Sequence, residues 1–182
     1  MARARSGRSL LPALVVVALF LVAGGLLVAV TTVDVVRGSL SVCPEGSFDD
    51  QLEVDGRQVC TFTNLNGTEA TFGTSIYNDG PLPITVSEVP MEPLDLVGFT
   101  PTEVHVAAAG DDRRLEEFES FRLGPGEERL VQVVGELPAC EDREEGGATT
   151  FTDLALRVRV LGIPQDAAVP IEPAVRLVSE PC

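Results

Sequence analysis

The sequence predicts an all-β fold, an antiparallel β-sandwich, preceded by one N-terminal transmembrane helix. Three observations predict it: an uncharged apolar segment near the N-terminus, a later series of short alternating runs separated by turn residues, and four cysteines that all follow the apolar segment. We expect four regions. They are a cytoplasmic basic N-terminus (1–9), the helix as a signal anchor (10–30), a stalk leading into the fold (31–50) and an exported sandwich domain (51–182).

The apolar segment Leu10–Val30 holds 21 residues with no charged or strongly polar side chain. At about 1.5 Å per residue a helix of this length spans roughly 31 Å, which matches a hydrocarbon core of about 30 Å. Arginines precede the segment at positions 3, 5 and 8, and the next basic residue is Arg37. The positive-inside rule therefore places the N-terminus in the cytoplasm and the domain outside, with the lipid bilayer as a partner. A cleaved signal peptide is the alternative, and it too exports the domain.

The charge of the chain excludes some classes of function. There are 13 basic residues, all arginine, against 28 acidic ones, so the formal net charge is −15. Three arginines come before Asp34, the first acid; residues 34–182 thus hold ten basic residues against 28 acidic ones and carry −18. Nucleic-acid binding needs clustered Arg or Lys, and is excluded on this ground. One His, one Tyr and no Trp also leave few residues for catalysis.

Short runs with β-like alternation follow the apolar segment, and glycine, proline and asparagine turns separate them. About seven such runs predict a two-sheet sandwich with a shared core. We expect the runs around 128–137, 154–161 and 174–179 to form a meander, and a short helix over Asp112–Ser120. The predicted strands are 58–63, 70–77, 84–89, 102–107, 129–134, 154–161 and 174–178.

Cys43, Cys60, Cys140 and Cys182 lie on the exported side, where an even count predicts two disulfides. Proximity favours the pair Cys43–Cys60, which would stabilise the fold by roughly 3 kcal/mol. The pair Cys140–Cys182 follows from the meander, because its first and third strands would end at the same pole of the sheet. The sequence has no CxxC or CxC pair, so structural bridges are favoured over metal binding or thiol chemistry.

Three stretches carry a resemblance to a known group. They are Tyr77–Val86, Phe118–Glu128 continuing into Leu130–Val133, and Leu156–Gly162 followed by Ala168–Ile171. Together with the N-terminal anchor, they resemble functionally uncharacterised, membrane-anchored immunoglobulin-like (Ig-like) proteins of GC-rich bacteria. The resemblance covers about residues 57–178. It implies an Ig-like sandwich and carries no catalytic residue with it.

The candidate chemical sites all have plainer interpretations. His105 lies between Val104 and Val106, so on a strand it points away from these apolar neighbours and faces solvent. No GxSxG motif accompanies it. The acidic run Glu141–Glu145 lacks the ligand spacing of a calcium loop and is expected to be a solvated loop. Asn66-Gly67-Thr68 matches a glycosylation sequon but also makes a good hairpin turn. We therefore predict no catalytic, cofactor-binding or metal-binding residue.

Prolines at 90, 93 and 101 bracket an apolar segment, and proline argues against a central strand there. This segment either forms an exposed partner-binding loop or folds back over the edge of the sandwich. The residues that would form the partner-binding loop are Leu94, Leu96, Val97 and Phe99.

The favoured function is binding, scaffolding or assembly in the cell envelope without catalysis, with an envelope protein as partner. Recognition would use loops at one pole or an open strand edge. One alternative is an envelope metal or redox helper of the copper-delivery type, although the chain lacks Cys–x–Cys, Met and His clusters. An anchored hydrolase is the least favoured.

Overall fold

The computed structural model describes residues 15–16, 19–20, 24–25, 33–45, 48–54, 56–64, 69–91, 99–108, 110, 114–136 and 147–179. The chain divides into two compact units, Met1–Thr32 and Val33–Cys182. In the first unit the three described pairs of residues have helical backbone. Within these described positions, no helix is long and apolar enough to span a bilayer. Most of the segment 10–30 lies outside them, so its membrane insertion stays a prediction.

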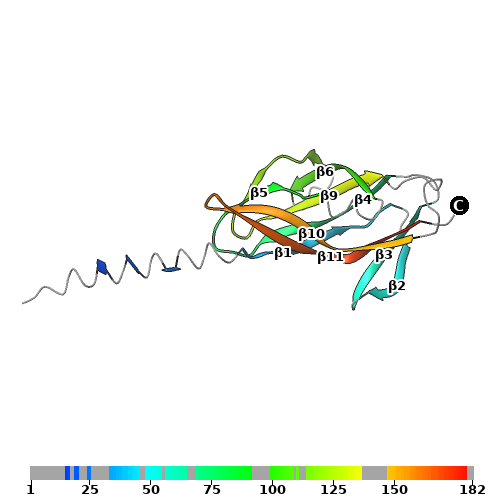
Figure 1. The fold of residues 1–182 in the computed structure, drawn as a ribbon, viewed down its shortest axis with the longest axis horizontal. Coiled ribbons are helices and arrows are strands. Elements are labelled where there is room, and N and C mark those ends of the chain that lie inside the picture. Colours follow the sequence, from blue (N-terminus) through cyan, green and yellow to red (C-terminus); the bar gives the residue numbers. More distant parts are fainter. Residues whose placement is uncertain are drawn as a thin grey trace, which may run out of the picture. The chain divides into compact units, whose positions relative to one another are not determined.

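The second unit is all-β, with eleven strands in two sheets among the described residues (Figure 1). The five-stranded sheet has the order β1-β4-β9-β6-β7, and the six-stranded sheet has the order β2-β3-β11-β10-β5-β8. Neighbouring strands are antiparallel except β3 and β11, which pair in parallel. The strands are β1 Val35–Val42, β2 Phe48–Val54, β3 Arg57–Asn64, β4 Glu69–Asn78, β5 Ile84–Glu88, β6 Thr100–Ala108, β7 Glu116–Glu117, β8 Phe121–Leu123, β9 Glu128–Glu136, β10 Gly147–Val160 and β11 Ile163–Ser179.

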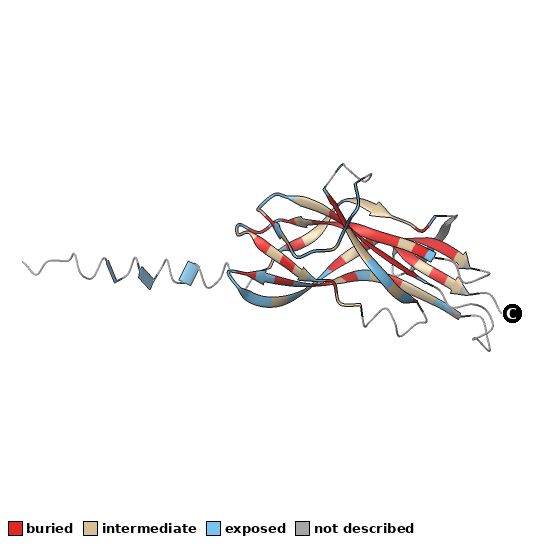
Figure 2. Cartoon of the chain, turned by 90° about the horizontal axis from the view of Figure 1, so that it is seen from above, coloured by how far each residue is buried: buried red, intermediate tan, exposed pale blue. Residues whose placement is uncertain are grey.

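One hydrophobic core contains buried residues from both sheets, which is compatible with a β-sandwich (Figure 2). The core forms because buried and exposed side chains alternate along the strands. In β10, for example, Leu154, Leu156 and Val158 are buried, while Arg157 and Arg159 are exposed. Every strand expected from the sequence is present, because alternation and turn residues mark these segments independently of tertiary contacts.

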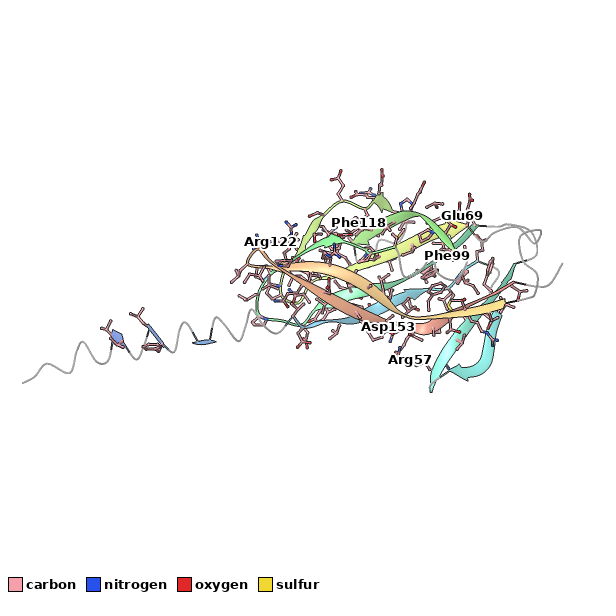
Figure 3. All side chains as sticks on the ribbon, in the orientation of Figure 1. Arg57, Glu69, Phe99, Phe118, Arg122 and Asp153 are labelled. Carbon is pink, nitrogen blue, oxygen red and sulfur yellow. A yellow bond between two sulfur atoms is a disulfide. The ribbon has the colours of Figure 1, made fainter. Side chains whose placement is uncertain are left out.

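Phe99 belongs to this core and not to an exposed loop (Figure 3). Its ring is fully buried and lies 5.4 Å from the ring of Phe72 and 5.9 Å from that of Phe151, centroid to centroid. Gly135 makes room for it, since a Cβ there would overlap the Phe99 ring. The expectation that Phe99 forms a binding loop is therefore wrong. Leu94, Leu96 and Val97 lie outside the described residues.

The segment 31–50 is not a stalk, because both β1 and β2 fall within it or begin in it. β1 pairs with β4 along most of its length, with an irregularity between Arg37 and Ser41. At this irregularity the Glu128 carboxylate accepts hydrogen bonds from the Ser39 backbone and hydroxyl. Gly38 and Ser39 are two of the small residues for which this segment was expected to be a stalk. In the fold they leave room for the Glu128 side chain and bind it. A Cβ on Gly38 would overlap the carboxylate and the Ser75 hydroxyl.

Two other expectations are wrong. The meander does not form, because β9 lies in the five-stranded sheet while β10 and β11 form a hairpin in the other. The reason given for the pair Cys140–Cys182 therefore fails, and both cysteines lie outside the described residues. No helix forms over the described residues 114–120: Glu116–Glu117 instead pairs with His105–Val106 as β7. Many exposed charges there, with few apolar residues, give a helix no face to bury.

On each of two sides of the domain, an edge of one sheet lies beside an edge of the other. The two sides differ in how the sheets are linked there. On one side, which we call the closed flank, the disulfide Cys43–Cys60 ties the end of β1 to β3, with 6.0 Å between the Cα atoms. This is the pairing that proximity favoured. Arg37 of β1 also donates to the Glu172 carboxylate of β11 at 2.9 Å. Covalent and ionic links therefore join the two sheets on this side.

Candidate functional site

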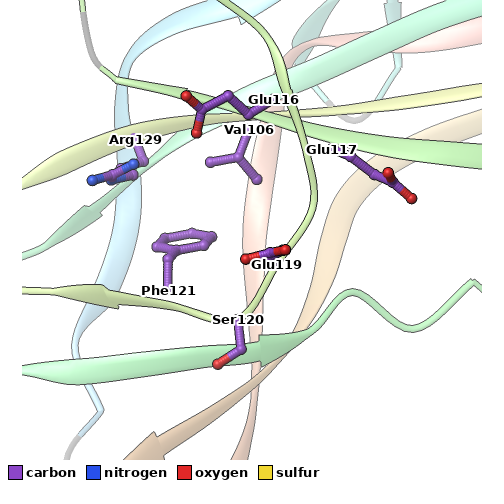
Figure 4. A pocket seen from close by; sticks show the side chains of 7 residues that line it. All are labelled: Val106, Glu116, Glu117, Glu119, Ser120, Phe121 and Arg129. Atoms are coloured by element: carbon purple, nitrogen blue, oxygen red, sulfur yellow. The ribbon is translucent and has the colours of Figure 1, made fainter.

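The opposite side, which we call the open flank, holds a hollow of about 410 Å³ (Figure 4). Here the short edge strands β7 and β8 belong to different sheets, and the chain between them passes from one sheet to the other. The residues that line the hollow are Val106 of β6, Glu116 and Glu117 of β7, Glu119 and Ser120 of the crossing, Phe121 of β8 and Arg129 of β9.

Local contacts fix the path of the crossing. The Phe118 backbone N–H donates to the Val104 carbonyl at 2.8 Å, which extends the pairing of β7 with β6 by one residue. The ring of Phe118 then meets that of Phe121 edge to face, with 6.0 Å between centroids. Phe121 pairs with Val86 of β5 in the six-stranded sheet. Two aromatic residues spaced by three thus hold the crossing against both sheets.

The hollow combines an aromatic floor with an acidic rim. The Arg129 guanidinium carbon lies 5.5 Å from the centre of the Phe121 ring, within cation–π range. In Figure 4 Phe121 lies between Arg129 and Glu119. The lining carries three glutamates and a single arginine. A second hollow of about 190 Å³ shares Val106, Glu116 and Arg129 with the first, so the concave surface continues along β6.

This arrangement suits a cation with an apolar stem. Lysine and arginine side chains lay their methylene groups on apolar surface while the charged head stays hydrated or paired. The Phe121 ring and Val106 supply apolar surface, and the three exposed carboxylates supply negative charge. The site can therefore bind a basic side chain.

Another hollow, of about 300 Å³, lies on the closed flank beside Arg37, Arg57 and Glu172. Here the polar groups are used within the fold. Arg37 donates to the Glu172 carboxylate and carbonyl, and Arg57 donates to the Thr152 carbonyl at 3.1 Å. Since its two arginines are already bonded, this hollow offers a ligand less than the one on the open flank.

His105 is partly buried rather than fully solvent-facing, with 23% of its side chain exposed. Its Nε2 lies 2.9 Å from the Glu103 carboxylate, two residues earlier on the same face of β6. Its Nδ1 is buried without a hydrogen-bond partner. The two residues form a local pair on the strand. Across the described residues, no group of three or more His, Cys, Asp or Glu side chains is placed to hold a metal ion.

Of the other predicted site residues, Cys43 and Cys60 are joined in a disulfide and so are not free as ligands. The acidic run Glu141–Glu145 and the sequon Asn66–Thr68 lie outside the described residues. Sequence reasoning missed the open-flank hollow, because the segment that crosses between the sheets overlaps the helix expected over Asp112–Ser120 and the stretch Phe118–Glu128 that carries the resemblance, and neither indicates a hollow. The sequence feature that could have indicated the hollow is the pair of aromatic residues Phe118 and Phe121 within a glutamate-rich segment.

Comparison with known proteins adds little. No protein-family model matches the chain, and no curated protein matches it. Among solved structures, the VesB protease of Vibrio cholerae is similar with a TM-score of 0.32 and 15% sequence identity. The similar region covers 66% of this chain and 30% of that chain, so it spans less than a third of the protease. A similarity at this level carries no argument about fold or function.

Proposed function

We propose that the chain is a single-pass envelope protein whose exported domain binds a partner and catalyses no reaction. Leu10–Val30 is the anchor, with the N-terminus in the cytoplasm. Its length, its lack of charge and the arginines before it support this orientation. The disulfide Cys43–Cys60 supports an oxidising compartment for the domain.

The strand order supports the finer assignment of an Ig-like sandwich. Such folds place strands A, B, E and D in one sheet and C, F and G in the other. The order β1-β4-β9-β6 corresponds to A-B-E-D, and β5, β10 and β11 correspond to C, F and G. The hairpin β2–β3 is then an insertion between A and B. The domain departs from the antibody pattern, because its disulfide joins β1's end to β3 and it has no tryptophan.

The observation that carries the binding proposal is the open-flank hollow with its Phe121 floor and glutamate rim. The partner group is a lysine or arginine side chain on another envelope protein. The excess of 18 negative charges on residues 34–182 favours the approach of such a basic partner through long-range attraction.

A peptide titration tests the binding proposal. The full chain in lipid nanodiscs is titrated with short peptides that differ only at one central residue, which is Lys, Leu or Glu. We expect the Lys peptide to bind best and to shift the NMR signals of Val106 and the Phe121 ring. Replacing Glu117 and Glu119 by Gln weakens binding severalfold, because two of three rim charges are lost. Glu69→Gln, at an exposed position outside the hollow, is the matched control.

Equal binding of the three peptides, or equal loss with the Glu69 control, would contradict the proposed site. Topology is tested separately with a C-terminal tag. In intact spheroplasts an added protease should remove the tag, while in inverted vesicles the tag should be protected. The reverse pattern would contradict the proposed orientation, whatever the peptides show.

A further inference from the structure

The turn of the β10–β11 hairpin exposes large apolar side chains. The strands pair up to Val160 and Ile163, and the two-residue turn Leu161–Gly162 has positive φ at both positions, 50° and 84°. Asn, Asp and Gly are the residues that such a turn favours, since a left-handed backbone disfavours a side chain like that of Leu. Leu161 is nevertheless there, 56% exposed, and Ile163 is 50% exposed. The turn thus keeps an apolar tip at a conformational cost.

This tip lies at the pole of the domain where its first strand begins (Figure 1). Val35 of β1 pairs with Asn78, and the Asn78 side chain donates to the Leu123 carbonyl at 3.1 Å. Leu123 pairs with Ile84, which in turn pairs with Val160 next to the tip. A continuous series of bonded residues therefore runs across this pole, from the start of β1 in one sheet to the hairpin in the other.

The length of the chain before the domain sets how far this pole can lie from the proposed anchor. The compact unit begins at Val33, three residues after Val30. Three extended residues reach at most about 10–11 Å. With Leu10–Val30 in a bilayer, this short connection leaves the pole where β1 begins within reach of the lipid surface.

Unpaired positive charge lies next to the tip. Arg122, Thr85 and Arg159 are aligned in register across β8, β5 and β10. Both arginines are exposed, and among the described residues neither has an ion-pair partner, whereas Arg157 bonds to Glu88 at 2.8 Å. These two guanidinium groups therefore place positive charge beside an apolar tip in a domain of strong negative charge.

Acids are also present at this pole: Asp34, Asp79 and Glu127 are exposed. The first two lie where the chain enters β1, and the Asp79 backbone donates to the Asp34 carbonyl. The carboxylate of Glu127 accepts a hydrogen bond from the Gly124 backbone. The positive and apolar groups are thus gathered on the β8–β5–β10 side of the pole, where the neighbouring acids, Glu88 and Asp166, both pair with Arg157.

We infer that the β10–β11 tip is a second membrane contact, which rests on the proposed anchor. Leu161 and Ile163 enter the interfacial layer of the bilayer, and Arg122 and Arg159 lie against lipid phosphates. The domain then touches the membrane through β1 of one sheet and the hairpin of the other. Two contacts would restrict how the domain can turn on the membrane surface.

Tryptophan fluorescence tests this, because the chain has no Trp of its own. Leu161→Trp and Ile163→Trp are made singly in the full chain and reconstituted in phosphatidylcholine–phosphatidylglycerol vesicles with brominated acyl chains. We expect blue-shifted emission and strong quenching for both. Glu69→Trp is the control: it lies at the other end of β4 from Asn78, about 30 Å away, and should stay unquenched (Figure 3).

A second set of variants tests whether Arg122 and Arg159 lie against lipid phosphates. Arg122→Gln with Arg159→Gln should reduce the quenching of the Ile163→Trp reporter, and this loss should vanish in vesicles of phosphatidylcholine alone. Arg176→Gln, which removes the same charge near the other end of β11, where Arg176 pairs in register with Thr150, is the matched control. Solvent-like, unquenched emission from both reporters in chains that float with the vesicles would overturn the inference and leave the anchor intact. Chains that do not float would overturn both. Emission that shifts only when an envelope protein is added would assign the tip to a protein contact and overturn the lipid contact.

Discussion

Replacing Phe99 by alanine is expected to destabilise the domain by about 3–5 kcal/mol. The Phe99 ring is fully buried, contacts the rings of Phe72 and Phe151 and packs over Gly135. Truncating a buried Phe costs about this much through lost transfer energy and the cavity left behind. The two aromatic contacts place the value in the upper part of that range. For a domain stability of about 5–15 kcal/mol this is a large loss.

The measurement is urea unfolding of the full chain in detergent micelles, followed by far-ultraviolet circular dichroism. Leu115→Ala is the matched control, because Leu115 is apolar but 43% exposed and its loss should cost no more than about 0.5 kcal/mol. Phe99→Leu keeps most of the volume and should cost no more than about 1.5 kcal/mol. It therefore gives a measurable value if the alanine variant does not fold. A Phe99→Ala cost equal to that of Leu115→Ala would refute the core assignment.

Three further predictions concern the rest of the domain. Hydrogen bonds from the side chain of Ser75 and from Ser39, against desolvation, hold the pKa of the Glu128 carboxyl below its ordinary value. The unfolded state therefore binds more protons in acid, so this contribution to stability is complete above about pH 4.5 and is lost as pH falls through the folded pKa. Urea midpoints from pH 3 to 6 should show a shallower acid decline in Glu128→Gln than in the native chain. Gly73→Ala should destabilise by about 1–3 kcal/mol, because its Cβ would overlap a β9 carbonyl that the sheet holds in place; an unchanged midpoint would argue against this register. Serine at both Cys43 and Cys60 should cost roughly 3 kcal/mol, as expected for a separation of 17 residues, and adding reductant should lower the stability of the native chain by about this much more than that of the variant.

Alternation and turn residues allowed each predicted strand to be located, because the burial of one face leaves a period of two in the sequence. Val86 and Val158 are buried where the pattern places them. The bounds and pairing of the two edge elements of the open flank could not be predicted, for the opposite reason. β7 and β8 have two and three residues, too few to show a period. Their positions depend on tertiary contacts, such as that between the rings of Phe118 and Phe121.

Distant pairings could not be predicted from local patterns. The sequence indicates that 128–137 and 154–161 are strands, but it does not indicate that they lie in different sheets. Phe99 shows the same limit. The prolines around it argue only against a central strand and leave an exposed loop and a segment folded over the sandwich edge both open, whereas burial against Phe72 and Phe151 depends on residues far away in the chain. The candidate site was missed because its lining comes from β6, β7, β8 and β9 together.

The parallel pairing of β3 with β11 determines when the domain can be completed during biosynthesis. Val59 pairs with Ala174, near the C-terminus. β11 is also the strand that joins the β2–β3 hairpin to β10, β5 and β8. A nascent chain that still lacks β11 therefore has a divided six-stranded sheet, with unpaired edges on both halves. This sheet cannot be completed until β11 has been synthesised, long after β3, so its assembly depends on contacts between segments far apart in the sequence.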